Sequence, residues 1–499
     1  MMGLPYFYAK EKNGRVETRG TCSCFLGHKI DHTPGQRSDG IYAGWSWDGQ
    51  RLIVENDRYG FYPLFYYCRD GEICLSPSIP QILSLVSQKS FDYTALSVFL
   101  RLGFFIGDDS PFTHIKAMPP DVAFKWEGGS LEISGRYARQ KPITISKDEA
   151  VERYTHLFRQ AIQRRLPQDD HFVIPLSSGR DSRHILLELH HQGYKPEFCV
   201  TSRKHFAKDE DDIRIAGMLT ASLGIKHVVL DQNNDFFKDN LRNITLTNYC
   251  ALEGAWMHVM AEYLKSHTQT IYDGIAGDTL SEGNFNIPRH AALFRSESYS
   301  ELAEEILNFW HAMDEEAFKI ILRKGIYQKI CRETAAHHLK AELQKHVHAA
   351  NPLGAFYFWN RTRRIISLCV QTIYKGIKNI QTPYLDHDLY DFLAALPGEF
   401  FMNQKIHTDT ILKAYPQCSK IPFHSGNAAP PKIQSERIKY TRNIVKHFFT
   451  RRLFRPGMLK RTYLVPRMAR SLISRDYCRS LEWIRPTFLL YLMELGILN

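Results

Sequence analysis

The sequence predicts a mixed α/β chain with an antiparallel β layer first, then a doubly wound parallel sheet, then a mostly helical part. In the front part, short alternating strands are separated by tight-turn dipeptides. In the middle part, short apolar runs alternate with segments of helical period, which is the pattern of repeated βα units. From about residue 285 onward the helical period dominates.

Two hairpins are expected in the front part, because each has an Asp-Gly dipeptide between two short β-prone runs. Asp-Gly is a strong signal for a two-residue turn between antiparallel strands. We expect few helices before Tyr93 and an all-β layer of roughly 130 residues. The expected strands are 41–47 and 51–54 around Asp48-Gly49, and 65–68 and 73–76 around Asp70-Gly71.

The middle part begins with a helix whose apolar residues recur at helical spacing. Apolar strands and helices then alternate, and glycines follow two of the helices. This order predicts a parallel sheet that binds ligands at the carboxyl ends of its strands. The expected elements are helix 147–165, strand 172–176, helix 183–191, strand 198–201, helix 209–223, strand 227–230 and strand 270–274.

The bulk composition is that of a globular protein, with 44% apolar and 23% charged residues. A length of 499 residues suggests two or three domains. The ten cysteines, several in apolar runs, fit a reducing compartment. Cys22 and Cys24 have no second pair at the spacing of a zinc site. Residues 1–10 lack the pattern of a signal peptide, and no apolar run is long enough to span a membrane, so we expect a cytoplasmic protein.

The formal charge of +11 is concentrated near the carboxyl end. Such a stretch can attract phosphates, acidic peptides or anionic lipid. The apolar residues among these charges, including Ile444 and Phe448, favour solvated helix faces with buried anchors. The basic residues are Arg437, Lys439, Arg442, Lys446, Arg451, Arg452, Arg455, Lys460 and Arg461.

Residues 173–182, Val-Ile-Pro-Leu-Ser-Ser-Gly-Arg-Asp-Ser, predict an anion-binding turn between a buried strand and an amphipathic helix. Such a turn directs backbone N–H groups and the positive end of the helix toward a bound anion. Three serine hydroxyls add donors, and Gly179 allows the backbone to approach closely. Asp181 would repel a phosphate unless it binds Mg²⁺. An ordinary capped turn is the alternative.

This segment resembles the Ser-Gly-Gly-x-Asp-Ser loop of the ATP pyrophosphatases, specifically of asparagine synthetase-like proteins. Three further stretches resemble that family in the same order, and the resemblance covers about residues 40–430. They are Phe198-Cys-Val-Thr201, Asp273-Gly-Ile-Ala-Gly-Asp278 and Thr382-Pro-Tyr-Leu-Asp-His387. The resemblance implies that Asp181 and Asp278 hold Mg²⁺ against pyrophosphate and that backbone near Val200 faces adenine. The implied ATP-binding residues are Leu176, Ser177, Ser178, Gly179, Asp181, Ser182, Val200, Asp273 and Gly274.

Three residues depart from the family pattern. Ser178 replaces the first glycine of the loop, and serine tolerates a positive φ poorly, so the turn is expected to differ in detail. Ile275 stands where asparagine synthetases carry a glutamate of the amide-forming step, and Thr279 replaces another acidic residue. These changes argue against asparagine as the product and leave adenylation intact.

Residues 56–66, Asn-Asp-Arg-Tyr-Gly-Phe-Tyr-Pro-Leu-Phe-Tyr, resemble a stretch of class II glutamine amidotransferase domains. Those domains use an amino-terminal cysteine as the nucleophile. This chain begins Met1-Met2-Gly3, and nothing upstream of Cys22 or Cys24 suggests processing to expose either thiol. We therefore expect a structural domain, with free ammonia or a substrate amine in place of glutamine-derived ammonia.

The resemblance divides the chain into a degenerate amidotransferase-like domain at 1–135, an ATP pyrophosphatase domain at 145–435 and a basic helical extension at 436–499. It implies an AMP-forming carbon–nitrogen ligase that uses ATP and Mg²⁺. A substrate carboxylate attacks the α-phosphorus of ATP, and an amine then attacks the acyl-adenylate. Lys420 is the expected catalytic lysine, and Lys432 is its competitor. His424 lies nearby, but a lone histidine in a loop is usually not catalytic.

Other functions and partners stay open. β-Lactam synthetases and the macrolactam cyclases of lasso peptides share the loss of the cysteine and close an amide within one small-molecule or peptide substrate. A non-catalytic scaffold or regulator would explain Ser178, Ile275 and Thr279, but not the retention of Asp181 and Asp278. A tRNA-modifying enzyme would use the basic carboxyl region, yet no catalytic cysteine pair or RNA-binding module is evident. A homodimer is also compatible with the sequence.

Overall fold

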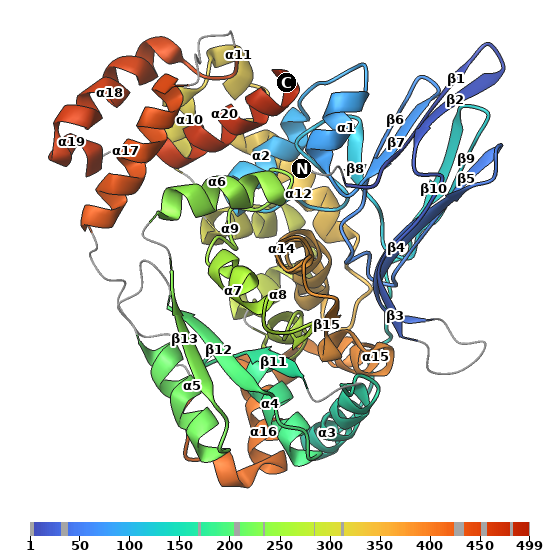
Figure 1. Ribbon diagram of the computed structural model, residues 1–499, viewed down its shortest axis with the longest axis vertical. Helices are drawn as coiled ribbons and strands as arrows, with labels where there is room; N and C mark the ends of the chain where they lie inside the picture. Colours follow the sequence, from blue (N-terminus) through green and yellow to red (C-terminus); the bar gives the residue numbers. More distant parts are fainter. Residues whose placement is uncertain are drawn as a thin grey trace.

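The computed structural model shows a β sandwich beside a parallel α/β sheet, with the last helices lying near the first ones (Figure 1). The described residues are 4–30, 38–167, 171–203, 210–232, 235–283, 285–310, 314–423, 434–450, 457–479 and 483–498. The predicted fold class is confirmed: antiparallel sheets first, then a five-stranded parallel sheet with helices, then a helical end.

The front part consists of two five-stranded sheets with the orders β2-β1-β7-β6-β8 and β10-β9-β5-β4-β3. All strand pairs within them are antiparallel. Apolar side chains between the sheets, including those of Leu52 and Trp126, form a core of their own. The strands are β1 (Phe7–Lys12), β2 (Arg15–Gly20), β3 (Ser23–Ile30), β4 (Asp39–Trp47), β5 (Arg51–Asn56), β6 (Phe65–Arg69), β7 (Glu72–Ser76), β8 (Ile115–Ala117), β9 (Ala123–Glu127) and β10 (Ser130–Ser134).

Both predicted hairpins are present, as β4–β5 and β6–β7. At the second turn, Asp70 and Gly71 have φ values of 48° and 72°, the paired left-handed conformation that a type I′ turn requires. The front part also contains helices α1 (Ile79–Leu85) and α2 (Tyr93–Leu102). Helix α1, which follows the N-cap Ser78, was not predicted from the sequence.

The parallel sheet has the strand order β13-β12-β11-β14-β15. Because β11 pairs with β12 on one side and with β14 on the other, the winding direction reverses between β11 and β14. Ligands of doubly wound sheets bind at such a switch point, at the carboxyl ends of the strands. The strands are β11 (Phe172–Pro175), β12 (Phe198–Arg203), β13 (His227–Asp231), β14 (Thr270–Tyr272) and β15 (Asn379–Gln381).

Helices follow the strands and make up most of the chain after β14 (Figure 1). Two short segments, η1 and η2, are π-helical, and η3, η4 and η5 are 3₁₀ turns. Up to η2 the helices are α3 (Lys147–Gln163), α4 (Asp181–His191), α5 (Asp211–Ser222), α6 (Phe236–Leu246), α7 (Met257–Leu264), η1 (Asp278–Glu282), α8 (Pro288–Arg295), α9 (Tyr299–Trp310), α10 (Glu315–Ile321), α11 (Lys324–Tyr327), α12 (Arg332–Gln344), α13 (Pro352–Tyr357) and η2 (Phe358–Ile366). The others are α14 (Ser367–Ile373), η3 (Pro383–Leu385), α15 (His387–Ala395), η4 (Gly398–Gln404), α16 (Lys405–Ala414), η5 (Pro416–Cys418), α17 (Gln434–Thr450), α18 (Arg461–Ile473), α19 (Arg475–Arg479) and α20 (Ile484–Leu498).

The amidotransferase-like stretch 56–66 forms a loop that joins the sandwich to the rest of the molecule. The Asp57 carboxylate accepts hydrogen bonds from the backbone N–H groups of Tyr59, Phe61 and Tyr62. The ring of Tyr59 then packs 4.8 Å from that of Tyr390 in α15. The motif therefore has a visible structural function at the contact between the two regions.

The carboxyl-terminal helices share a hydrophobic core with the front part of the chain. Ile444 and Phe488 belong to the same buried cluster as Ile79 and Phe99, from α1 and α2. Lys439 and Lys446 on α17 are exposed, as expected for a solvated basic face. No helix among the described residues combines the length and apolarity that crossing a membrane requires.

Candidate active site

The loops that follow β11 and β14 meet at the switch point of the parallel sheet. The first loop, residues 176–180, leads into α4 at Asp181, and the second loop, residues 273–278, leads into η1. A Cβ atom on Gly277 would lie 2.3 Å from Asp181 Oδ1, and one on Gly274 would lie 2.6 Å from Asp181 Cβ. The two loops are therefore in direct contact, and the glycines leave the space that the aspartate occupies.

The first loop is held by its own hydroxyl groups. The N–H of Ser177 donates to Ser182 Oγ at 3.1 Å, and the N–H of Gly179 donates to Ser177 Oγ at 3.2 Å. Ser178 donates from both N–H (3.1 Å) and Oγ to Asp212 Oδ1 in the first turn of α5. Ser178 is buried and does not have a positive φ. The turn is thus compatible with serine in place of the family's first glycine.

Asp181 carries an unpaired buried oxygen. Its side chain is 22% exposed, but Oδ1 is buried and accepts no hydrogen bond from any residue that the structure describes. Burial, followed by the nearby carboxylates of Glu282 and Asp278, raises the pKa of Asp181 well above its usual range. An arrangement of this kind is costly unless a cation neutralises it.

Carboxylates from the second loop and from η1 lie near Asp181. Asp273 and Asp278 come from the second loop, and Glu282 comes from the end of η1. Asp273 Oδ1 accepts the N–H of Ile275 at 2.9 Å, and burial raises the pKa of Asp273 to about 6. Hard oxygen donors grouped in this way fit a divalent cation such as Mg²⁺. The residues present are therefore compatible with the predicted metal.

His407 of α16 lies against the same group. Ligand atoms of Asp181, Glu282 and His407 all lie within 4.8 Å of one another. Ser281 donates its hydroxyl proton to Gly277 O at 2.7 Å, so His407 Nδ1, 3.0 Å from Ser281 Oγ, must be the donor of that pair. This tautomer leaves no lone pair on Nδ1 for a metal. Burial lowers the pKa of His407 well below its usual range, so the ring is neutral, and its Nδ1 lies 3.7 Å from Asp181 Oδ1.

On its other side, Asp278 faces η2. Asp278 Oδ2 lies 3.5 Å from Arg361 Nη1, and Asp278 Oδ1 accepts the hydroxyl of Thr279 at 3.1 Å. Thr279 Oγ1 also lies 2.7 Å from Thr362 Oγ1, so the two π-helical segments touch beside the site. π-Helical turns occur frequently at functional sites.

Two of the residues predicted to bind ATP are buried. Leu176 and Val200 are 3% and 0% exposed. The N–H of Leu176 donates to Val200 O at 2.8 Å, and Thr201 Oγ1 donates to Leu176 O at 2.8 Å. These bonds fix the backbone where the first loop leaves the sheet. Ile275, which replaces the family's glutamate, is 3% exposed and belongs to the central apolar core.

The predicted catalytic lysine is not placed among these groups by any contact. Lys420 is exposed, in the turn that follows η5. Its competitor Lys432 and the neighbouring His424 lie outside the described residues. The assignment of the lysine therefore stays a prediction.

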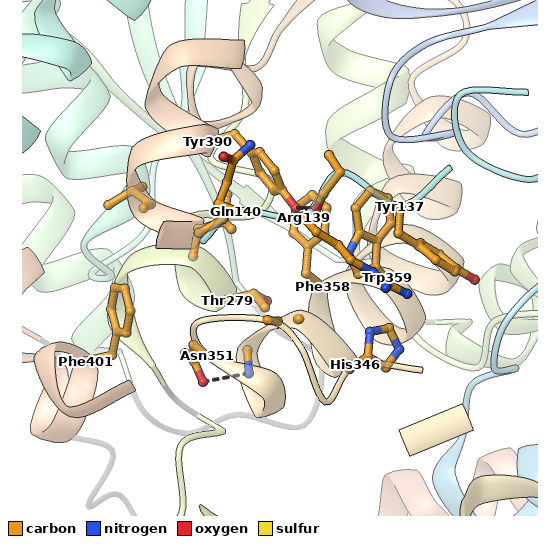
Figure 2. Close-up of a pocket in the computed structure, with 17 residues that line it drawn as sticks. Tyr137, Arg139, Gln140, Thr279, His346, Asn351, Phe358, Trp359, Tyr390 and Phe401 are labelled. Carbon is orange, nitrogen blue, oxygen red and sulfur yellow. Dashed lines mark hydrogen bonds between the residues drawn. The ribbon is translucent and has the colours of Figure 1, made fainter. Parts of the chain in front are cut away.

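A small cavity lies behind η1, between the interdomain segment 137–140 and the helices α13, η2 and α15 (Figure 2). Thr279, which bonds Asp278, forms part of its wall together with the aromatic rings of Tyr137, Trp359 and Tyr390. Its volume of about 40 Å³ suits a few water molecules rather than a side chain of a substrate.

The site combines a doubly wound sheet with a Ser/Gly loop and a carboxylate loop that meet at its switch point. A family model for asparagine synthase matches residues 153–414, just over half of the chain, and one for a glutamine amidotransferase domain matches residues 27–138. The chain belongs to the asparagine synthase family, a family of ATP-dependent amide-forming ligases. No curated protein matches it.

Among solved structures, the chain is similar to three proteins at low identity. The first is a predicted subunit of tRNA methyltransferase from Methanocaldococcus jannaschii, with 20% identity, coverage of 22% of this chain and 54% of that one, and a TM-score of 0.17. An NMN synthetase from Francisella tularensis has 14% identity, coverage of 40% and 97%, and a TM-score of 0.22. An NH₃-dependent NAD synthetase from Campylobacter jejuni has 12% identity, coverage of 40% and 95%, and a TM-score of 0.21. The chain thus spans about half the length of the first of these.

Sequence reasoning missed four residues of the site: Asp212, Glu282, Arg361 and His407. Glu282 had a weak sequence signal. It follows Asp278 by four residues, and residues four apart on a helix lie on nearly the same face. Asp212, Arg361 and His407 lie on α5, η2 and α16, and only the folded chain brings them to the loops.

Proposed function

We propose that this protein is an AMP-forming amide ligase that adenylates a substrate carboxylate and does not use glutamine. The observation that supports this most is the buried, unpaired Oδ1 of Asp181, which faces the carboxylate loop at the switch point of the sheet. A scaffold has no reason to keep such a costly oxygen, whereas a metal–nucleotide site needs it.

In the proposed reaction, a carboxylate oxygen of the substrate attacks the α-phosphorus of ATP, and the bond to pyrophosphate breaks. Asp181 and Asp278 would hold Mg²⁺, and the ion would supply positive charge against the leaving pyrophosphate. The N–H groups and hydroxyls of residues 176–182 orient the phosphates. The pyrophosphate-side contacts proposed are Ser177, Ser178, Gly179, Ser182, Asp273 and Gly274, and Leu176 and Val200 lie on the adenine side.

In the second step an amine attacks the acyl carbon, AMP departs with the electron pair of the C–O bond, and the amine loses a proton. We assign the stabilisation of the tetrahedral oxyanion to Lys420, with Lys432 as the alternative. The amine in this proposal is free ammonia or a group of the substrate, in place of ammonia from glutamine. The burial of Ile275 where the family has a glutamate favours a product other than asparagine. An intramolecular β-lactam or macrolactam cyclase is therefore the second candidate.

The ten free cysteines suit a reducing compartment, so we place this reaction in the cytoplasm. The carboxylate is a small molecule or a peptide.

Calorimetry of ATP binding to the full chain, with and without Mg²⁺, tests the proposal. The ligase should bind ATP tightly only with Mg²⁺, and Asp278→Asn should weaken binding about tenfold or more, because it removes a charge-bearing ligand. Asp314→Asn on α10, the N-cap of that helix, is a control that removes the same charge elsewhere. ATP binding that is independent of Mg²⁺ in both the wild-type chain and Asp278→Asn would favour a non-catalytic scaffold.

A further inference from the structure

Arg361 is a cationic residue at the site, and none of the family motifs in the sequence includes it. Arg361 Nη1 is 3.5 Å from Asp278 Oδ2, and Arg361 Nη2 is 3.5 Å from Glu253 Oε2 in the loop before α7. The side chain of Arg361 is 14% exposed, while that of Glu253 is 52% exposed. The guanidinium therefore lies just inside the mouth of the site, beside the predicted metal ligand.

The neighbouring arginines show what a structural arginine looks like in this segment. Arg363 Nη2 donates to Asp108 Oδ1 and to Met118 O, both at 2.7 Å, and Arg364 Nη1 and Nη2 donate to Gly107 O at 2.5 Å and Asp109 O at 2.6 Å. These short bonds tie η2 to the front part of the chain. Charge-assisted bonds usually measure 2.7–2.9 Å, so the 3.5 Å contacts of Arg361 are loose by comparison.

The guanidinium of Arg361 also packs against two aromatic rings. Its Cζ lies 5.1 Å from the ring centre of Phe285 and 5.6 Å from that of Trp310. Trp310 is held in turn by a bond from Nε1 to the hydroxyl of Tyr357 at 3.2 Å. Cation–π contacts of this kind hold a guanidinium without using its N–H groups. Arg361 is thus preorganised but only weakly engaged by its two carboxylates.

A cation bound at Asp278 would compete with Arg361 for the same carboxylate. The guanidinium would then need another anionic partner, and its forked donors match phosphate and carboxylate oxygens. We propose that Arg361 contacts an anionic group of a reactant, either the terminal phosphates of ATP or the carboxylate to be activated. This inference rests on the proposed ligase function and adds a substrate-contacting residue to it.

The first test is calorimetry of pyrophosphate with Mg²⁺ on the full chain. Arg361→Met should weaken binding about tenfold or more if Arg361 contacts phosphate, since a bond to a charged group is worth on the order of 10- to 100-fold. Arg242→Met is the matched control, because this substitution removes the same charge from an exposed pair with Glu262. Arg361→Lys should give an intermediate affinity, because lysine keeps the charge and loses the fork.

The second test measures ATP–pyrophosphate exchange over a panel of aspartate, β-amino acids and short peptides. If pyrophosphate binding is unchanged in Arg361→Met but the KM for the active carboxylate rises about tenfold, Arg361 contacts the carboxylate. If neither quantity changes, the inference is overturned while the proposed function stands. If the wild-type chain neither binds pyrophosphate with Mg²⁺ nor catalyses exchange with any carboxylate, the proposed function fails together with the inference.

If Arg361→Met does not fold, Glu253→Gln provides a second test of the same inference. It removes the exposed competitor for the guanidinium and leaves Arg361 in place. An anion-contacting Arg361 then binds pyrophosphate or the carboxylate several-fold more tightly than in the wild type. A purely structural Arg361 gives equal or weaker binding in Glu253→Gln, and that result would overturn the inference.

Discussion

At the scale of single residues, the family motifs have two different functions, and only one of them concerns the site. Asp386, in the stretch Thr382–His387, accepts N–H bonds from Asp388 and Leu389 as the N-cap of α15. It also pairs at 2.9 Å with Arg165, which pairs in turn with Asp39 of the β sandwich. All three side chains are at most 1% exposed. Asp386 therefore joins the two regions of the chain, whereas Tyr384 of the same stretch lies beside the site, with its hydroxyl 3.1 Å from His407 Nε2.

Arg165→Met should lower the free energy of unfolding by about 3–5 kcal/mol, because it takes this buried cation from Asp39 and leaves Asp386 with only the part-exposed Arg164. Arg164→Met is the control, since Arg164 pairs with the same Asp386 but is 29% exposed, and it should cost about 1 kcal/mol or less. Urea unfolding of both variants measures the difference. Equal losses would contradict the interpretation of Arg165 as the buried bridge.

Residues that follow a strand directly could be predicted from the sequence, because strand-to-helix turns in parallel sheets collect at one edge. Asp181 was predicted in this way, whereas Asp273 and Asp278 were predicted from the family resemblance. Glu282, His407 and Arg361 could not be assigned, because their position depends on how η1, α16 and η2 pack. The concern about Ser178 rested on a positive φ that this residue does not have.

At the scale of elements, two constraints place the second loop against α4. Ala276 has a φ of 73°, a left-handed conformation that costs a non-glycine residue about 1–2 kcal/mol. Gly277 has an ordinary φ of −58°. Glycine is therefore required at this position only because Asp181 occupies the space that a Cβ atom would take. Backbone strain of this kind is frequent at functional sites.

Gly277→Ala should therefore displace Asp181 and weaken Mg²⁺-dependent ATP binding about tenfold or more. The backbone itself should stay stable, because alanine adopts a φ of −58° freely. Gly325→Ala on α11 is the control, because its added Cβ would meet no atom within 4 Å. Calorimetry and a thermal melt on both variants separate the two effects. Unchanged ATP binding in Gly277→Ala would show that Asp181 does not need its present position.

The strands and helices that were predicted individually have a clear apolar period, as in β4–β5 and α3. Strand β15 was missed, since three residues carry no period, yet it forms the fifth strand of the parallel sheet. Helix α1 was missed because it has only seven residues. The π-helical form of η1 and η2 has no local sequence signal and follows from packing.

At the scale of the whole molecule, the carboxyl-terminal helices are part of the main structure. α20 contacts α1, and α17 contacts α6, so the last residues complete a core to which residues as early as Tyr8 contribute. The charge pattern indicated only an exposed basic face. It could not show which apolar surface the other face covers, because that surface lies more than 300 residues away in the chain.

Phe488→Ala should lower the free energy of unfolding of the whole protein by about 3–5 kcal/mol, because the ring is 1% exposed. Ile473→Ala, at a side chain 87% exposed, should have almost no effect. Thermal melts followed by circular dichroism provide the comparison. A separate early transition in Phe488→Ala, with the main transition unchanged, would show that the helices are an independent appendage.

ATP–pyrophosphate exchange tests the central claim most directly, because it reports carboxylate activation without requiring the amine. With Mg²⁺ and the right carboxylate from the panel, the wild-type chain should exchange labelled pyrophosphate into ATP. Asp181→Ala should lose this activity by on the order of 10³-fold, since several kcal/mol of charge stabilisation disappear. Exchange that persists in Asp181→Ala at the wild-type rate would contradict the account.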